Sequence, residues 1–92
     1  MPYTVARLKV EDYDKFKRML FAEDSSTLRQ SYGFRGGRLF RSTSDPQEII
    51  SLAEWDDLEK ARQFYQSSGL RERQQSGGVV RPIELYVEVD SF

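Results

Sequence analysis

The stretch Asp45–Glu72, DPQEIISLAEWDDLEKARQFYQSSGLRE, decides the fold, because its hydrophobic period changes once from two residues to nearly four. Over Gln47–Trp55 the residues alternate as in a strand, and both faces carry apolar side chains, which is typical of a central strand. Asp56 and Glu59 then have the Asp-x-x-Glu spacing of a capping box. An apolar stripe at helical spacing follows, made of Leu58, Ala61, Phe64 and Tyr65. The stretch therefore predicts a central strand followed by a helix.

The residues before this stretch predict a second strand and a second helix. Tyr3–Val10 alternates, with Thr4, Ala6, Leu8 and Val10 on one face. From Asp12 onward apolar residues return at helical spacing, beginning with Tyr13 and Phe16, and acidic residues occupy the first turn. Because Ser and Thr side chains compete for backbone hydrogen bonds, we expect a kink or a restart of the helix at Ser25–Thr27. Gly33 offers the left-handed residue that ends the helix.

Two further strands complete the predicted set. Phe34–Ser42 reads as a strand with a bulge or a close backbone approach at Gly36 and Gly37, and Ser44, Asp45 and Pro46 supply the turn after it. We expect an interruption of the second helix at Ser67–Gly69, a short helical piece over Leu70–Gln75, and an end at Gly77 and Gly78. The cleanest alternation in the chain predicts a last strand over Ile83–Asp90.

The resulting order, β-α-β-β-α-β, predicts an α+β fold of the ferredoxin-like type, with a four-stranded antiparallel sheet and two helices on one face. At 92 residues and without a linker or repeat, we expect one domain over residues 1–92. The face of the sheet without helices is expected to carry apolar residues, either Tyr3, Val5 and Ile49 or the residues of whichever register points outward. We therefore expect a homodimer in which two sheets pack face to face.

Composition excludes several classes of function. There is no Cys and no His, so thiolate catalysis, Ser-His-Asp chemistry and most transition-metal sites are excluded, and we expect no metal. A net charge of −1 argues against nucleic-acid binding. No segment approaches a membrane span or an export signal, so we expect a cytoplasmic protein without membrane partners. Glu84, Glu88 and Asp90 lie too far apart along the last strand for one cation, which favours a solvated face.

Several segments resemble the antibiotic biosynthesis monooxygenase-like proteins of the dimeric α+β barrel superfamily. The most specific is the strand ending in Glu54-Trp55 with the capped helix behind it, supported by Gly77-Gly78 and Pro82 before the last strand. The remaining segments are DYDKFKRMLFAED, SYGFRGGRLFRS and QQSGGVVRPIELYVEV. The resemblance covers nearly the whole chain and rests on residues that shape the fold.

The resemblance implies a cavity between sheet and helices that accepts a flat, apolar small molecule. Some members oxidise an aromatic polyketide with O₂ and without metal or flavin, and others degrade haem. Active members use an Asn with a Trp, together with a His or an Arg. Trp55 matches the strand-end Trp, whereas the chain has no Asn or His, which disfavours haem degradation through a His ligand. By this resemblance no cofactor is required.

Candidate residues for such a cavity are aromatic, with one basic group. Each of these residues has a plainer interpretation as core or as solvated charge. For Arg38, alternation predicts a face opposite to Arg35 and Arg41, and an Arg here could stabilise an oxyanion. Glu54 could act as a base if it were buried, or pair with a neighbouring Arg. The candidate set is Trp55, Tyr65, Phe64, Tyr13, Phe16 and Arg38.

Two hypotheses about function follow from these residues. The first is a cofactor-independent, monooxygenase-like enzyme acting on an aromatic or polyketide-like small molecule, with catalytic residues unassigned. The second is a small-molecule-binding or structural dimer of the same fold without chemistry, which the missing Asn and His favour.

Overall fold

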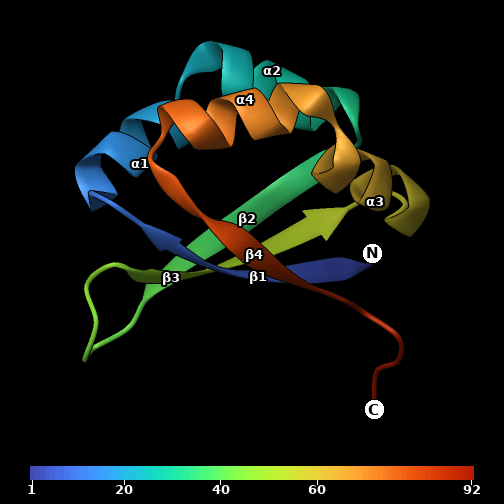
Figure 1. The fold of residues 1–92 in the computed structure, drawn as a ribbon. Coiled ribbons are helices and arrows are strands. Elements are labelled where there is room, and N and C mark those ends of the chain that lie inside the picture. Colours follow the sequence, from blue (N-terminus) through green and yellow to red (C-terminus); the bar gives the residue numbers. More distant parts are fainter.

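The computed structural model describes residues 1–92 as one four-stranded sheet with helices on one side of it (Figure 1). The strands are β1 (Tyr3–Val10), β2 (Phe34–Arg41), β3 (Glu48–Trp55) and β4 (Val79–Val87). The helices are α1 (Tyr13–Leu20), α2 (Glu23–Ser31), α3 (Leu58–Gln66) and α4 (Ser68–Ser76). This order confirms the predicted α+β ferredoxin-like plan, with each of the two expected helices divided in two.

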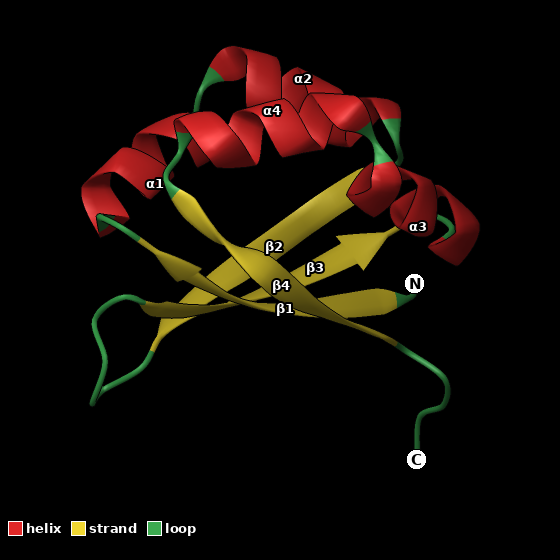
Figure 2. Cartoon of the chain, viewed as in Figure 1, coloured by secondary structure: helices red, strands yellow, loops and turns green.

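The sheet is antiparallel throughout and has the strand order β2-β3-β1-β4. β3 is central, as its two apolar faces predict, and all four helices cover the same face (Figure 2). Along β1 the residues Thr4, Ala6, Leu8 and Val10 are buried and face the helices. The single chain thus builds one covered face and one uncovered face.

The predicted bounds of the last strand were wrong. β4 starts at Val79, four residues before Ile83, and ends at Val87 rather than Asp90. A register shift between Arg7 and Lys9 of β1 disturbs the pairing with the first part of β4, so simple alternation does not continue through it. The strand ends where β1 begins, and the last ladder bond runs from the Glu88 amide to the Tyr3 carbonyl at 3.0 Å.

The break in the first helical segment also lies elsewhere than predicted. The kink or restart expected at Ser25–Thr27 occurs earlier in the chain, because the helix breaks at Phe21 and Ala22 and restarts as α2, which runs through Ser25–Thr27. Ala22 offers no side-chain cap, but Arg29 donates from Nη1 to the Leu20 carbonyl at 2.8 Å. This bond satisfies a carbonyl at the end of α1 and stabilises the break.

The cap of α3 is Asp57 rather than the predicted Asp56. Asp57 accepts the Glu59 amide at 3.1 Å, whereas Asp56 forms an ion pair with Arg35 at 2.7 Å. Arg35 is the extra residue of a bulge in β2 between Phe34 and Gly36, one residue earlier than the predicted glycine pair.

The covered face holds two separate groups of buried apolar residues. One group is built around Phe16 and Ile49, so Ile49 faces the helices and its predicted place on the uncovered face was wrong. The other is built around Trp55 and Phe64 near α3. Tyr65 packs against both groups.

Where these two groups meet, the covered face of β1, β2 and β3 has small residues, and Ala6 belongs to the first group and Ala53 to the second. Ala6 pairs with Ser51, and Gly37 pairs with Ala53, so the four lie together in the middle of the sheet. Because these side chains are short, they fill little of the space beneath the helices, while larger side chains at both ends hold the helices away from the sheet.

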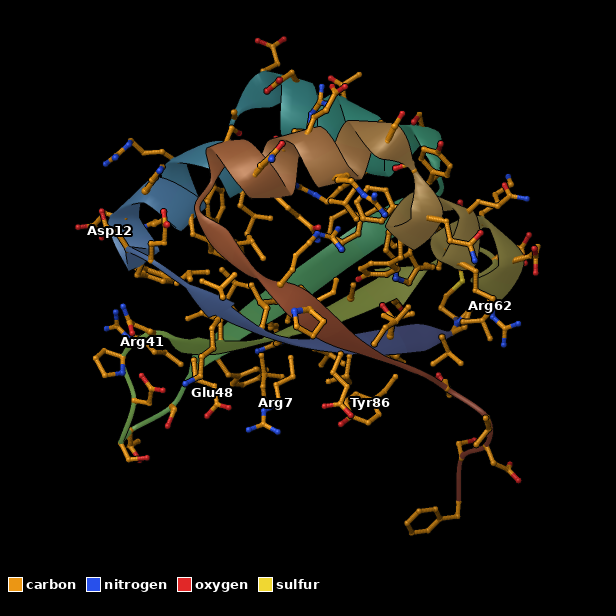
Figure 3. The ribbon with its side chains drawn as sticks, viewed as in Figure 1. Arg7, Asp12, Arg41, Glu48, Arg62 and Tyr86 are labelled. Carbon is orange, nitrogen blue, oxygen red and sulfur yellow. The ribbon has the colours of Figure 1, made fainter.

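The uncovered face, which we call the open face, carries apolar side chains beside charged ones. Figure 3 shows Arg7, Glu48 and Tyr86 pointing away from the helices, and Arg7 and Glu48 form an ion pair. The large apolar residues exposed on this face are Tyr3, Phe40, Ile50, Val80 and Tyr86. None of the four helices has the length and hydropathy needed to cross a membrane.

Candidate functional site

A cavity of about 480 Å³ lies between the small-residue centre of the sheet and the helices. Sixteen of its 24 lining residues are hydrophobic. The four small residues of the sheet form part of its wall, and Phe21 and Leu28 line it from the helical layer. A pocket of this size and lining suits a flat, largely apolar small molecule.

The structure brings most of the predicted site residues to this cavity. Tyr13, Phe16, Phe64 and Tyr65 all line it. Trp55 lies behind the wall, with 1% of its surface exposed and its ring centre 5.2 Å from Phe64 and 5.9 Å from Tyr65. Trp55 therefore supports the rings of Phe64 and Tyr65, which line the cavity in front of it.

Arg38 reaches only the margin of the cavity. Its partner across the ladder is Leu52, which also pairs with Val5 on the face opposite the helices, so the Arg38 side chain lies on the open face. Arg41 lies on the covered face, with its guanidinium 4.9 Å from the centre of the Tyr13 ring. The prediction that Arg38 and Arg41 lie on opposite faces of the sheet is therefore confirmed.

A chain of three side chains connects the buried Trp to the cavity. The Trp55 Nε1–H donates to the Thr4 hydroxyl oxygen at 2.9 Å, and this oxygen lies 3.3 Å from the Tyr65 hydroxyl. Thr4 is 1% exposed. Because Thr4 already accepts from Trp55, its own proton is free to go to Tyr65, which leaves the Tyr65 O–H free to donate to a ligand.

Two effects act in opposite directions on the Tyr65 hydroxyl. Burial raises its pKa above the usual value of a phenol, while the hydrogen bond with Thr4 and the charge of Arg29 partly offset that rise. Burial has the opposite effect on the Arg29 guanidinium and lowers its pKa. At neutral pH the pair is therefore a neutral phenol beside a cation, and both groups can donate hydrogen bonds into the cavity.

Arg29 lines the same cavity as Tyr65, and contacts with two other parts of the chain hold it there. Its Nη1 donates to the Leu20 carbonyl, and its guanidinium lies 5.2 Å from the centre of the Phe34 ring. The remaining N–H groups of the guanidinium are available to a ligand. Such a pair of donors suits an enolate, phenolate or carbonyl oxygen.

No carboxylate lines the cavity. Glu54 pairs with Gly36 and Tyr3, on the face opposite to the helices, and it forms none of the ion pairs in the structure. The acidic residues do not gather into a group that could hold a metal ion. The site therefore stabilises negative charge and contains no strong base.

Sequence reasoning did not find Thr4, Arg29 or Arg73 as residues of the site. Thr4 is one of an alternating set in β1, and the sequence gives no sign that its hydroxyl lies between Trp55 and Tyr65. The two Arg residues lie on polar helices, where a basic residue usually faces solvent. The cavity itself could have been predicted from the small residues Ala6, Ser51 and Ala53. Three short side chains on one face of two paired strands leave room above them.

Fold and site together define a ferredoxin-like protein with an apolar small-molecule cavity beneath its helices. The family model described as antibiotic biosynthesis monooxygenase matches residues 4–76, and the chain belongs to this family. No curated protein matches the chain.

Solved structures agree with this fold. A protein from Bordetella bronchiseptica assigned to the same family superposes with a TM-score of 0.74 at 19% identity, covering 99% of this chain and 97% of that one. SnoaB from Streptomyces nogalater, a cofactor-independent oxygenase, gives a TM-score of 0.68 at 17% identity, with coverage of 98% and 94%. A family protein from Nitrosomonas europaea gives 0.67 at 11% identity and covers both chains fully. At these identities the likeness concerns the fold.

Replacing Thr4 by Val tests the chain of three side chains. The change keeps the shape but removes the acceptor of the Trp55 N–H, so we expect a loss of about 1 to 3 kcal/mol in the free energy of unfolding. The pKa of Tyr65 should rise further, because a donor to the phenolate is lost. Thr4→Ser, which keeps the hydroxyl, is the control. Spectrophotometric titration of the tyrosines, with Tyr65→Phe as reference, measures the shift, and an unchanged Tyr65 titration contradicts the arrangement.

Proposed function

We propose that the protein is a cofactor-independent monooxygenase that acts on a flat hydroxylated aromatic molecule bound beneath its helices. The observation that carries the proposal is the Tyr65 hydroxyl, oriented through Thr4 by Trp55 and placed beside Arg29 in a mostly apolar cavity. Family membership and the fold shared with SnoaB support this assignment.

The proposed role of each side chain follows from its position. Phe16 and Phe64 contact the rings of the substrate, and Tyr13 extends the same wall. Tyr65 and Arg29 donate hydrogen bonds to the substrate oxygen and lower the pKa of the substrate, so that it loses its proton to water without a protein base. Trp55 acts through Thr4 as a positioning residue. Arg38 has no role in this proposal, because its side chain lies on the open face.

The reaction balances without an added reductant. An anthrone-like substrate loses a proton from its CH₂ group, and the carbanion, delocalised onto the oxygen held by Tyr65 and Arg29, forms a C–O bond with O₂. Protonation gives a hydroperoxide, whose remaining C–H bond and O–O bond break to leave a carbonyl and one water molecule. One oxygen atom enters the product, the other leaves as water, and the substrate supplies all four electrons.

A binding protein without chemistry is the second candidate. The absence of any carboxylate or imidazole from the cavity favours it, because nothing in the wall can abstract a proton. Both candidate functions involve the same ligand, but only the enzyme converts it to a product.

Oxygen consumption with 1,8-dihydroxyanthrone as probe separates the two candidates. We expect the protein to accelerate oxidation above the spontaneous rate, with one atom of ¹⁸O₂ in the product and no hydrogen peroxide. Tyr65→Phe should reduce the acceleration by about 100-fold, the usual effect of removing one oxyanion donor. Tyr32→Phe removes a hydroxyl that does not line the cavity and serves as the control. Tight binding of the probe without acceleration overturns the enzymatic proposal and identifies a binding protein.

We also propose a homodimer in which two open faces pack together. Tyr86 is 50% exposed and Phe40 is 52% exposed, and they lie on the same face as Leu52 and Val5. Water-exposed aromatic residues of this kind favour burial against a second copy. The absence of Cys and of a membrane-spanning helix is compatible with a cytoplasmic location, which belongs to the same proposal.

Light scattering after gel filtration tests the dimer. At micromolar concentration we expect a particle with twice the chain mass of 10.8 kDa. Leu52→Lys places a charge within the apolar part of the open face and should give monomers, since an unpaired buried charge is costly. Gln63→Lys adds the same charge on exposed α3 and should remain dimeric. A wild-type mass of one chain contradicts the proposal.

A further inference from the structure

Two polar groups in the helical part of the cavity wall lack a partner. Ser25 of α2 is 3% exposed, and its Oγ makes no hydrogen bond. Arg73 of α4 has a buried Nε–H that is also without a partner. Both residues line the cavity. Buried donors of this kind normally have a hydrogen-bond acceptor, so we expect a ligand in the cavity to supply an acceptor to each of them.

The two residues are linked through Asp24, the residue before Ser25, whose carboxylate contacts both the Ser25 backbone amide and Arg73. One oxygen of its carboxylate accepts the Ser25 amide at 2.9 Å, and the other lies 3.3 Å from Arg73 Nη2. The third nitrogen of Arg73, Nη1, donates to the Gly69 carbonyl at 3.0 Å. The outer nitrogens of the guanidinium are thus fixed by the protein, and Nε remains for a ligand. We call Ser25 and Arg73 together the α2–α4 corner.

The charge of the cavity wall shows which kind of acceptor fits. The ionisable side chains among the lining residues are basic apart from the two tyrosines, Tyr13 and Tyr65, and no Asp or Glu is present. This contrasts with the whole chain, which has a net charge of −1. Asp24 is the nearest carboxylate and is mostly exposed, so its charge is screened by water and offsets the basic wall only in part. The basic side chains of the wall are Lys17, Arg29 and Arg73, whereas the side chain of Arg38 lies on the open face.

We propose that the α2–α4 corner binds the carboxylate of an aromatic acid, so that the ligand of the cavity is an anionic aromatic rather than a neutral one. The Arg73 Nε–H and the Ser25 hydroxyl donate to its carboxylate oxygens, while the rings lie against Phe16 and Phe64. This inference rests on the proposed function, since it assumes the aromatic ligand. In this proposal the α2–α4 corner recognises the carboxylate of the ligand, while Tyr65 and Arg29 bind the oxygen that takes part in the reaction.

A matched set of probes tests the corner by isothermal titration. The set is 3-hydroxy-2-naphthoic acid, its methyl ester and 2-naphthol, which share the ring system and differ in the anionic group. We expect the acid to bind wild-type protein at least tenfold more tightly than the ester, because charge-assisted hydrogen bonds are stronger than neutral ones. Arg73→Gln should abolish this preference, and Ser25→Ala should reduce it about threefold.

Arg62→Gln removes the same charge from an exposed position on α3 that does not line the cavity and should keep the preference (Figure 3). Thermal unfolding of each variant shows that it is folded, and Ser25→Ala provides a milder change if Arg73→Gln is unstable. Equal binding of acid and ester overturns the inference and leaves the aromatic ligand in place. A preference that survives in both corner variants but disappears in Arg29→Gln also overturns it. Failure of all three probes to bind contradicts the proposed function itself.

Discussion

The shortness of four side chains in the middle of the sheet is the constraint on which the site depends. Ala6, Gly37, Ser51 and Ala53 come from three neighbouring strands and meet on the covered face. Larger residues on either side of them, around Ile49 and around Trp55, pack against the helices and set the distance between the layers. The centre cannot be filled from the sheet, so a cavity of about 480 Å³ remains within a chain of 92 residues.

The polar groups of the site are arranged by the same geometry. Thr4 is the only hydroxyl-bearing residue in the buried set of β1, and its position brings it between Trp55 and Tyr65. The break between α1 and α2 is stabilised by Arg29, whose guanidinium lines the same cavity as Tyr65 and whose charge acts on the Tyr65 phenol. Residues that hold the fold together at these points also carry the donors that face a ligand. The cavity is therefore equipped to bind an oxygen that carries negative charge.

The strands and the layer architecture could be predicted from alternation, because a period of two is visible wherever one face is buried. β1 was predicted residue by residue, whereas the start of β4 was hidden by the register shift opposite Arg7 and Lys9. For the site, aromatic spacing pointed to Tyr13, Phe16, Phe64 and Tyr65, which line one cavity. Arg29, Arg73 and Ser25 were not predictable, since their burial follows from the crossing of α2 and α4, and one sequence does not encode that crossing in a local pattern.

The unfolding free energy of Ser51→Leu tests most directly whether the centre of the molecule is hollow. Ser51 lies in the small-residue centre and lines the cavity, so a Leu there would extend into empty space and bury apolar surface. If the centre is hollow, the unfolding free energy of Ser51→Leu equals or exceeds that of the wild type, measured by urea denaturation at the same protein concentration. A loss of about 1 to 3 kcal/mol, the usual cost of overpacking a filled core, would contradict it.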